Sequence, residues 1–460
     1  MHARRLRVAV FADSAAFSVL ASSAIAVPAV FSISQPDVFA LPKTILTLAL
    51  AGLLAGLLTV RQIASGPRPR PPYPVLTAAL VVFVGWNLLA FWFAIDRQQA
   101  LFGERLQFQG LASILAYVVF LIAAWITVRG PRRQSLLLAS VAAGAALVAT
   151  YAVVQRAGLD PIWLTLPHDR VFSTIGQANA LAAYLVLVVP LIVSLAAGRR
   201  LAAKVAVVSV VALAVVALAF TLSRGGYLGL AAAAIVLGVL AWPKRRILMA
   251  TPWLRLVPLA GVVVLVLVLS VPGIQAVAQR FVARALLTAD LSEGSIKNHL
   301  DLWNVGIAIA ADHPIVGTGQ DTYVLLFGGY RDRVLSPERA VVMMIFRPES
   351  PHNVYLATAA GAGLPALAAY VAIVAAVVGR ILGALRTTAD PRAWLVGAAL
   401  LSAIVGHLVT DAFITAETAG SVLFWTVLGM GAALVANSRR SASADYWRPA
   451  GCTCLPRRSG

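Results

Sequence analysis

The sequence is dominated by apolar runs, each close to the roughly 20 residues that an α-helix needs to cross the hydrocarbon core of a bilayer. Twelve such runs are expected, at residues 9–32, 40–60, 74–95, 111–128, 134–155, 178–198, 202–221, 225–242, 253–272, 353–379, 393–411 and 419–437. Hydrophobic residues make up 60% of the 460 residues and charged residues 12%, which excludes a soluble fold with a polar exterior. The sequence therefore predicts an all-α polytopic membrane protein with about twelve transmembrane helices.

Basic residues are concentrated in alternate connections between these runs. With the N-terminus inside, the connections expected on the cytoplasmic side hold 24 of the 37 Lys and Arg residues and two acidic residues, Asp390 and Asp445. Because Lys and Arg stay on the cytoplasmic side, both termini are expected there. The formal net charge of +19 is thus a topology signal, helped by membrane lipids, and needs no nucleic-acid partner.

One connection expected on the outer face, residues 273–352, is roughly 80 residues long, whereas the other outer connections are short. Its seven basic residues are matched by eight acidic ones, so a small folded cap is expected. The predicted organisation places membrane helices one to nine in residues 1–272, this outer loop in 273–352, helices ten to twelve in 353–437 and a basic cytoplasmic tail in 438–460.

The two ends of the chain carry weaker signals. The first apolar run follows basic residues, as in a signal peptide, but it continues past residue 30 and contains Asp13, so a retained helix is expected. Cys452 and Cys454 lie in the tail without His or Cys partners, which predicts neither a disulfide framework nor a zinc site.

The outer loop ends in Ser350-Pro351-His352-Asn353, directly before the tenth apolar run. A Ser hydroxyl can cap a helix and Pro fits the first helical position, so His352 is expected in a first helical turn. The positive end of the helix dipole disfavours an imidazolium and attracts anions. The segment therefore suits a neutral base beside a phosphate; the alternative is a polar helix cap at a membrane boundary.

A second polar segment, Thr-Leu-Ser-Arg-Gly-Gly-Tyr at residues 221–227, separates the seventh and eighth runs. A tight outer hairpin is expected here, with the glycines supplying the turn. Arg224 either snorkels to lipid phosphates or, with adjacent backbone N–H groups, binds a phosphate, for which its fixed donors are suited.

Two further polar positions are expected on the outer side. Residues 170–182 lead from an outer loop into the sixth helix, where Asn179 and Gln177 either cap the helix or bind a sugar hydroxyl. Arg105 stands just before another helix, where an interface anchor is the simplest interpretation.

Within the outer loop, residues 275–287 have the spacing of an amphipathic helix, with Arg280 and Arg284 on one face, typical of a helix lying on the bilayer surface. A second helix is expected to open at His299 and to end at Asp312. The following Gly-Thr-Gly at 317–319 predicts a turn able to approach a ligand, although a lone motif of this kind is weak support for phosphate binding.

His407 and Asp411 lie four residues apart near the outer end of the eleventh run. A buried acid at membrane depth needs a partner or a function.

Four stretches in this order resemble the O-antigen ligase and polymerase family, over roughly residues 100–435. They are Gly176 to Leu181; Ser223-Arg224-Gly225; Leu300-Asp301-Leu302-Trp303 followed by His313-Pro314-Ile315-Val316-Gly317-Thr318-Gly319; and His352-Asn353 with Tyr355-Leu356 followed by Gly361-Ala362-Gly363-Leu364. No one of these motifs is specific, but their order and spacing are. Twelve spans with one large outer loop also match.

The resemblance implies roles for particular residues. His352 matches the family's essential His, proposed as general base on an acceptor hydroxyl, and Arg224 matches the Arg that grips the donor's diphosphate. His299 stands where the family usually has a second loop Arg, so the second phosphate contact falls to Lys297, Arg280 or Arg284, or the activity differs. Substrate-positioning roles are expected for Asn353, Asn179, Arg105 and Asp411.

The expected reaction moves a glycan from a polyprenyl-diphosphate carrier to an acceptor hydroxyl at the outer face of the cytoplasmic membrane, with inversion. A lipid diphosphate is a good leaving group, so positioning, charge neutralisation and one base suffice. The sequence shows no Asp-rich metal motif and no phosphate-binding loop with Lys, so no metal, ATP or other cofactor is expected. The expected partners are membrane lipids, the lipid-linked glycan donor and a glycan, lipid or protein acceptor.

Two alternatives remain. A polymerase of the same family would extend a glycan on its own carrier lipid. A membrane transporter, for example one related to inorganic-carbon uptake, would place functional charges near the bilayer midplane and broken helices in two similar halves.

Overall fold

The computed structural model describes residues 2–66, 73–160, 162, 170–196, 200–244, 294–346 and 348–434. The apolar run at 253–272, the amphipathic segment at 275–287 with Arg280 and Arg284, and the tail at 438–460 lie outside the described residues.

Within these ranges the fold is all-α, without β-strands. The helices are α1 (His2–Ala29), α2 (Ala40–Ser65), α3 (Pro74–Trp92), α4 (Arg97–Phe102), α5 (Leu111–Thr127), α6 (Pro131–Arg156), α7 (Ala178–Ser194), α8 (Leu201–Thr221), α9 (Arg224–Ala241), α13 (Gly294–Asp312), α14 (Tyr323–Val334), α15 (Pro337–Phe346), α16 (Val354–Thr387), α17 (Pro391–Asp411) and α18 (Thr418–Ala433), with short 3₁₀ turns at Ser173–Ile175 and Trp242–Lys244. Eight of the described helices are long and apolar enough to cross a membrane, and α5, α7 and α18 are shorter apolar helices. The chain is a multi-pass membrane protein; the total of twelve spans and the side of the termini stay predictions.

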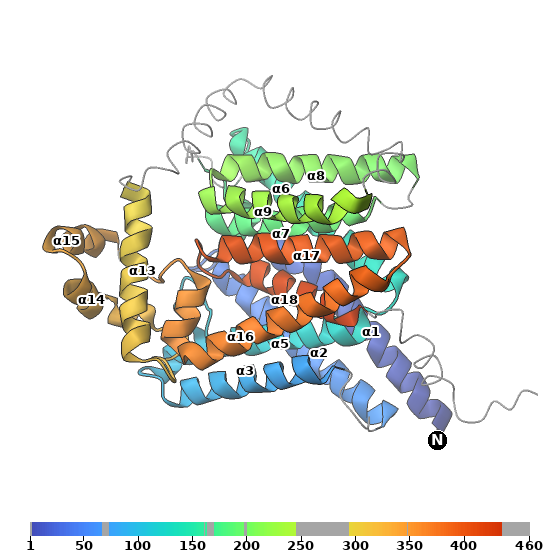
Figure 1. The fold of residues 1–460 in the computed structure, drawn as a ribbon, viewed down its shortest axis with the longest axis horizontal. Coiled ribbons are helices and arrows are strands. Elements are labelled where there is room, and N and C mark those ends of the chain that lie inside the picture. The colour runs from blue at the N-terminus through green and yellow to red at the C-terminus, as the bar shows by residue number, and fades with distance from the viewer. Residues whose placement is uncertain are drawn as a thin grey trace, which may run out of the picture.

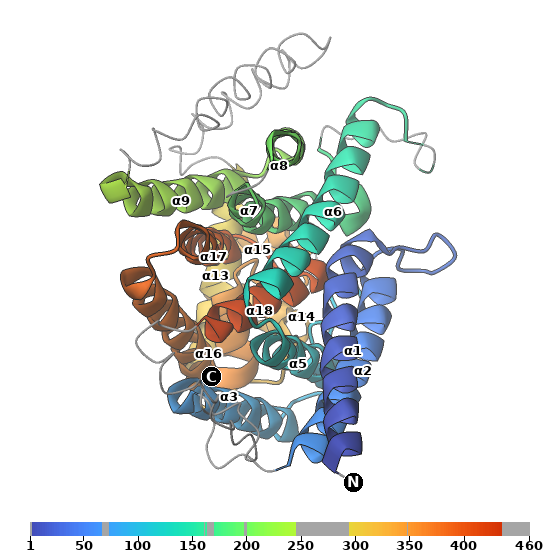
Figure 2. The same ribbon diagram turned by 90° about the vertical axis from the view of Figure 1, so that its right-hand side faces the viewer.

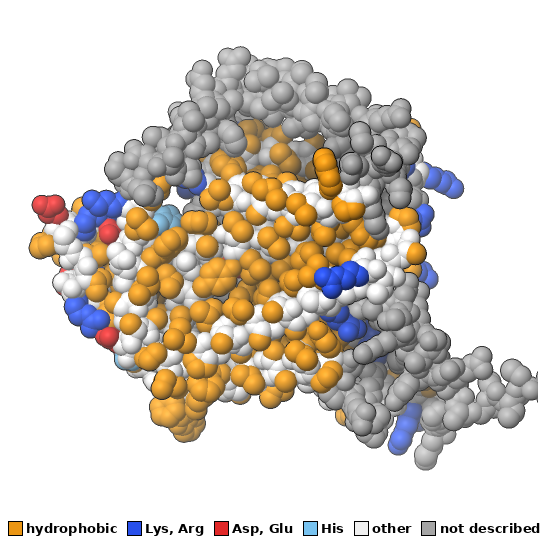
Figure 3. Space-filling model, viewed as in Figure 1, with side chains coloured by type: hydrophobic (Ala, Val, Ile, Leu, Met, Phe, Trp, Pro, Cys, Tyr) orange, Lys and Arg blue, Asp and Glu red, His pale blue; other side chains and the backbone are white. Residues whose placement is uncertain are grey.

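The apolar helices run side by side, and α13 lies across one end of them (Figure 1). Helices α14 and α15 lie beyond α13, and we call α13 to α15 the cap and this side of the bundle the cap end. The first turns of α1 lie at the opposite end (Figures 1 and 2). On the face drawn in Figure 3, hydrophobic side chains form a broad band, while acidic side chains gather on the cap and Lys and Arg side chains at both ends.

The shortest apolar helices occupy the middle of the bundle. Helix α18 packs against α5, α16 and α17, and α7 packs against α17, α8 and α9 (Figure 2). Nearly every residue of α7 and α18 is buried, as expected for helices that are hydrophobic on all sides. The irregular segment 412–417 precedes α18, and backbone of this kind is tolerated inside a membrane protein where it is enclosed by protein or lines a cavity.

Helix α16 has a kink in its first part. Gly363 has φ 83° and ψ 166° inside the helix, and Pro365 follows it. A side chain at Gly363 would collide with the carbonyl oxygen of Ile315, because a Cβ atom there would lie 2.0 Å from it. The short first part of α16 and the long second part are therefore one element kinked at a glycine that lets the loop after α13 approach.

This close approach also explains the Gly-Thr-Gly segment. The Thr318 N–H donates to the carbonyl of Ala360, and the Gly319 N–H donates to the carbonyl of Gly361, at 3.0 and 2.8 Å. Gly317 has φ 67°, and its Cα lies against the Gly361 backbone. Two of the four family-like stretches thus pair with each other, and the turn approaches another backbone.

The cap has a hydrophobic core that continues into α16. Leu302 and Val305 of α13 pack with Tyr323 and Phe327 of α14 against Ala359 of α16. This packing fixes α13 across the end of the bundle and places its His299 side near the start of α16.

A salt bridge within the cap adds to this packing. Arg339 of α15 donates to Asp301 at 2.6 Å and to the side chain of Asn298, also at 2.6 Å. Asp301, which belongs to the Leu-Asp-Leu-Trp stretch, is thereby held by the cap itself.

The two acids that the sequence places at membrane depth both have partners. Asp13 of α1 accepts hydrogen bonds from Arg61 at 2.6 Å and from Arg133 at 2.5 Å. Asp411 of α17 lies 3.4 Å from Nε2 of His407, and both side chains are buried. The Asp13 cluster joins α1 and α2 to the start of α6, whereas the His407–Asp411 pair lies near the cap end.

Candidate functional site

His352 lies just before α16 and not in its first turn, so that prediction was wrong. The helix begins at Val354, because the side-chain oxygen of Asn353 accepts hydrogen bonds from the N–H groups of Tyr355 and Leu356, both at 3.0 Å. Asn353 is therefore the helix cap. The Ser350 hydroxyl, expected to be the cap, instead accepts a hydrogen bond from the His352 N–H at 3.2 Å.

The His352 backbone is left-handed, with φ 48°. Such a conformation is uncommon for a non-glycine residue, and residues held in it gather at functional sites. Four other described non-glycine residues share it: Phe108 with φ 53°, Ser173 with φ 52°, Leu222 with φ 49° and Asp321 with φ 58°.

The His352 side chain is oriented by the segment between α17 and α18. Its Nδ1 lies 2.8 Å from the Thr415 hydroxyl, which is also hydrogen-bonded to the Ser350 hydroxyl. Since the two ring nitrogens point in different directions, fixing Nδ1 leaves Nε2 facing away from Thr415. The ring of His299 lies 5.7 Å from the His352 ring, centroid to centroid.

Burial, with a smaller contribution from His299, lowers the pKa of His352 from 6.5 to about 4. A low-dielectric environment disfavours the charged imidazolium, and a second imidazole nearby disfavours it further. His352 is therefore neutral at physiological pH. A neutral imidazole with one nitrogen fixed is the form needed to accept a proton.

Arg224 is the first residue of α9, and the turn before it differs from the expected one. Leu222, in a left-handed conformation, ends α8, and the Ser223 side chain caps α9 by accepting a hydrogen bond from the Gly226 N–H at 3.3 Å. The glycines lie inside the first turn of α9, where a Cβ atom on Gly225 would come within 3.0 Å of Phe413. They serve close helix packing, and Leu222 makes the turn.

The segment 412–417 contacts residues that adjoin Arg224 and His299, and it contacts His352 itself. Phe413 packs against Gly225, next to Arg224, and its ring lies 5.9 Å from the ring of Trp303, one helical turn after His299. Two residues later, Thr415 holds His352. Arg224, His299 and His352 therefore come from three distant parts of the chain to the surroundings of one loop.

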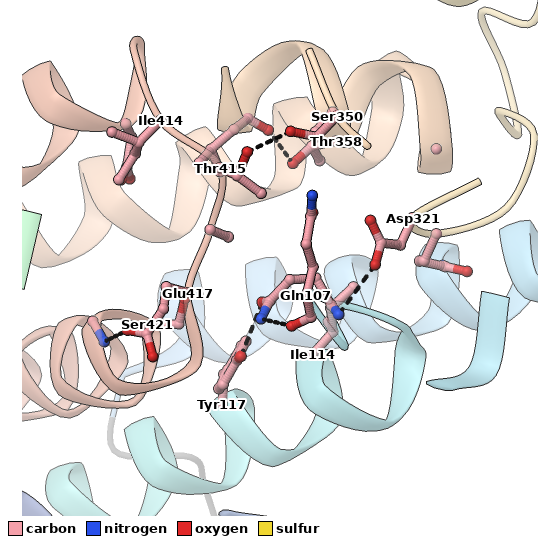
Figure 4. Close-up of a pocket in the computed structure, with 18 of the residues that line it drawn as sticks. Gln107, Ile114, Tyr117, Asp321, Ser350, Thr358, Ile414, Thr415, Glu417 and Ser421 are labelled. Carbon is pink, nitrogen blue, oxygen red and sulfur yellow. Dashed lines mark hydrogen bonds between the residues drawn. The ribbon is translucent and has the colours of Figure 1, made fainter. Parts of the chain in front are cut away.

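A cavity of about 140 Å³, lined in part by residues 414–417 of this loop, lies between α3, α5, α16, α17 and α18. Ser350 and Thr415 line one side of it and Gln107 and Tyr117 the opposite side, with Asp321 and Glu417 at its ends (Figure 4). Deeper in the bundle the lining is aromatic and includes Phe83, Tyr370, Phe424 and Trp425. His407 and Asp411 also face the cavity.

Asp321 lines the cavity and is hydrogen-bonded to the segment between α4 and α5. Its carboxylate accepts hydrogen bonds from the N–H groups of Glu104 at 2.7 Å and Gln109 at 3.2 Å. Burial raises the pKa of Asp321 to about 7, and the two backbone hydrogen bonds oppose that rise. Burial likewise raises the pKa of Glu417, whose carboxylate caps α18 at Gly420.

The other predicted site residues are scattered. The oxygen of Asn179 accepts a hydrogen bond from Arg170 at 2.5 Å, and Gln177, at the start of α7, makes no side-chain cap, so neither residue caps the helix as expected. Arg105 is exposed in the connection before α5, and Lys297 is exposed on α13. The structure thus brings His352, His299 and Arg224 together around one loop, places Asp411 in the cavity and leaves Arg105 at the surface.

Several residues around the site were not singled out from the sequence. Thr415 and Glu417 lie in a short polar interruption before the twelfth run, and Asp321 lies two residues after the Gly-Thr-Gly segment. Their positions beside apolar runs were a signal, but their partners are distant in the chain. The contact from Asp321 to Glu104 spans 217 residues.

Comparisons with known proteins bear on the same part of the chain. A sequence model of a family described as O-antigen ligase matches residues 209–371, from α8 to the middle of α16. A search among curated proteins gave no match. The matched region contains Arg224, His299 and His352. Residues 209–371 therefore carry the sequence pattern of the O-antigen ligase family, which confirms the resemblance that the four motifs indicated.

Proposed function

We propose that this protein transfers a glycan from a polyprenyl-diphosphate carrier to an acceptor hydroxyl at the cap end of the bundle. The observation that carries the proposal is His352, a neutral imidazole fixed at Nδ1 by Thr415, beside a loop that also contacts the surroundings of Arg224. A base and a phosphate-binding cation on two sides of one loop are the groups that such a transfer needs.

His352 acts as the general base. With Nδ1–H donating to the Thr415 hydroxyl, the lone pair lies on Nε2, which accepts the proton of the acceptor hydroxyl. The acceptor oxygen attacks the anomeric carbon as that carbon's bond to the diphosphate oxygen breaks. The proton ends on His352, and the electron pair leaves with the diphosphate. A single displacement inverts the anomeric centre.

Arg224 stabilises the leaving diphosphate. It stands at the N-terminus of α9, where the helix dipole and backbone N–H groups favour an anion, and its guanidinium suits phosphate oxygens. His299, in the place of the family's second Arg, lies nearer to His352 and contributes to keeping that base neutral. Lys297, exposed two residues earlier, is the described cation on α13 best placed to give a second phosphate contact.

The cap end faces the outer side of the cytoplasmic membrane in this proposal. The basic residues of the inner connections support that orientation through the positive-inside rule. The lipid tail of the donor lies in the bilayer beside the bundle, and its diphosphate reaches the headgroup level, where Arg224 stands.

Reconstitution tests the proposal. Purified protein in proteoliposomes is given a polyprenyl-diphosphate-linked oligosaccharide and a panel of acceptors: a lipid-linked glycan, a lipid A core, a cell-wall polymer and a peptide. Transfer to one of them, lost in both His352→Ala and Arg224→Ala, supports the proposal, and transfer only to a second lipid-linked glycan identifies a polymerase. No transfer to any acceptor by folded protein would contradict it.

A further inference from the structure

We propose that the cavity between α5, α16, α17 and α18 binds one uncharged sugar residue of the glycan substrate. The inference rests on the proposed function, because it assigns the cavity to a unit of the glycan taking part in transfer. It adds a binding site, its ligand class and a charge preference.

Three polar side chains that line the cavity carry an acceptor atom without a hydrogen-bond partner among the described residues: Nδ1 of His407, Oε1 of Gln320 and Oε1 of Glu417. His407 and Gln320 are each 4% exposed. A buried polar atom without a partner costs free energy, so native proteins satisfy such atoms. A ligand that reaches these atoms and donates hydrogen bonds to them removes that cost.

The other polar groups of these side chains are already engaged, which fixes their orientation. Gln320 Nε2 donates to the carbonyl of Asn87 at 2.8 Å. Nε2 of His407 lies 3.4 Å from Asp411, and with its proton there, Nδ1 is an acceptor. Glu417 uses Oε2 to cap α18 through the Gly420 N–H at 3.0 Å. All three free atoms are therefore acceptors held in place by the fold.

The deep wall of the cavity favours a ligand with an apolar face. The Trp425 ring lies 5.5 Å from the ring of Phe83 and 6.2 Å from that of Tyr370, and the Phe424 ring lies 4.7 Å from that of His407. A pyranose ring has an apolar C–H face and a rim of hydroxyl donors. That combination matches an aromatic wall facing fixed acceptors, whereas a lipid chain would leave the acceptors unsatisfied.

The described lining of the cavity offers an acidic ligand no cationic side chain. Asp321, Asp411 and Glu417 face the cavity, and the described residues that line it include neither Lys nor Arg. A carboxylate or phosphate placed here would lose its hydration without gaining a Lys or Arg partner in the lining. The cavity therefore selects a neutral sugar, and the donor diphosphate stays on the Arg224 side of the loop 412–417.

The cavity also adjoins the proposed base. Ser350 and Thr415, the two residues hydrogen-bonded to His352, form part of its wall. A sugar held there would press on the segment that orients the imidazole. Occupancy of the cavity and alignment of His352 are thus linked through Thr415.

Gly420 offers a direct way to fill the cavity. A Cβ atom there would have 3.9 Å to Glu417 Oε2 and 3.9 Å to Cε1 of His407, so alanine fits without collision. Gly420→Leu extends a side chain between these two residues and takes up ligand space. Gly420→Ala is the matched control, and Ser421→Leu fills the cavity from the next position if Gly420→Leu does not fold.

The experiment measures binding of methyl glycosides to the full-length protein in nanodiscs by saturation-transfer NMR, without any transfer reaction. The probes are the methyl glycosides of glucose, galactose, mannose and N-acetylglucosamine, with methyl glucuronide as the acidic counterpart of the glucoside. We expect at least one neutral glycoside to bind, the glucuronide to bind at least about tenfold more weakly than the glucoside or not at all, and Gly420→Leu to weaken neutral binding by at least about tenfold. Gly420→Ala should bind like wild type.

Three results would overturn the inference. The first is that no neutral glycoside binds to folded wild type, and the second is that Gly420→Leu and Ser421→Leu both bind neutral glycosides as tightly as wild type does. The third is that the glucuronide binds more tightly than the glucoside. Failure of the proposed function gives a different pattern. If Gly420→Leu abolishes glycoside binding and wild type transfers no glycan, the cavity is a sugar site and the proposed transferase activity is contradicted. Glycan transfer by Gly420→Leu at the wild-type rate would support the transferase and contradict the assignment of the cavity to a sugar.

Discussion

Oγ1 of Thr415 lies 2.8 Å from Nδ1 of His352, although the two residues are 63 positions apart in the chain. This contact joins the segment between α15 and α16 to the loop between α17 and α18. When Nδ1–H donates to this hydroxyl, Nε2 of His352 is the nitrogen free to act as a base. The proposed chemistry therefore depends on a loop that the family-like motifs do not include.

Replacing Thr415 by Val removes the hydroxyl and keeps the shape. We expect kcat to fall about tenfold with little change in KM for donor or acceptor, because the base loses orientation but the substrates keep their contacts. Thr415→Ser should retain most of the activity, since Ser supplies the same oxygen. Steady-state transfer kinetics of the two variants measure this. Equal rates for wild type and Thr415→Val would show that the hydroxyl does not position His352.

The low pKa of His352 predicts the acid limb of the pH profile. The neutral form is the base, so kcat/KM should stay level from about pH 8 to pH 5 and fall as the pH drops through about 4. An unperturbed imidazole would instead lose activity through about pH 6.5. His299→Gln removes the smaller cause of the shift and should move the midpoint upward, short of 6.5.

The same shift has a consequence for stability. Because the folded-state pKa of His352 is depressed, its contribution to the free energy of unfolding is complete above about pH 6.5 and is lost as the pH falls through about 4. Thermal unfolding of wild type and His352→Gln in nanodiscs between pH 4 and 7 measures the difference. The variant should show the weaker dependence on pH.

Arg224 and Arg105 are two arginines that are expected on the outer side and that have different predicted roles. Arg224→Ala should lower kcat/KM for the lipid-diphosphate donor by about 10²- to 10³-fold, because the leaving diphosphate loses its cation, and Arg224→Lys should recover part of the loss. Arg105→Ala, at an exposed position, should change kcat/KM by less than about twofold. Equal losses in the two Ala variants would point to general lipid binding and not to a diphosphate site.

The kink in α16 gives a prediction about stability. Gly363→Ala puts a Cβ atom onto the carbonyl of Ile315 and strains a positive φ, so we expect a loss of more than about 2 kcal/mol in the free energy of unfolding. Gly379→Ala, in the same helix with open space around it, should be neutral or stabilising by up to about 1 kcal/mol. Chemical unfolding in detergent compares the two variants. Protease cleavage of the cap should increase for Gly363→Ala alone.

The apolar helices were predictable because each apolar run has the length of a span. The run expected at 40–60 begins at the first residue of α2, and that expected at 111–128 ends one residue beyond α5. Local signals were less reliable where two caps competed. Ser350 and Pro351 predicted a helix start. The Asn353 side chain instead accepts hydrogen bonds from the first N–H groups of α16, so the helix begins four residues after Ser350.

Contacts between distant segments were beyond the sequence. The glycines at 317–319 indicated a close approach, but nothing local indicated that the partner was the backbone of Gly361. Thr415 became part of the site because α18 is short and leaves an irregular loop at the cap end. Its pairing with His352 follows from helix packing, which no spacing along the chain encodes.

The most direct test of the central claim counts two products in one proteoliposome reaction: glycan transferred and polyprenyl diphosphate released, in wild type and in folded His352→Gln. The account predicts one diphosphate released per glycan transferred in wild type. It also predicts a loss of both products in the variant by about 10²- to 10⁴-fold. Transfer by His352→Gln at the wild-type rate would contradict it.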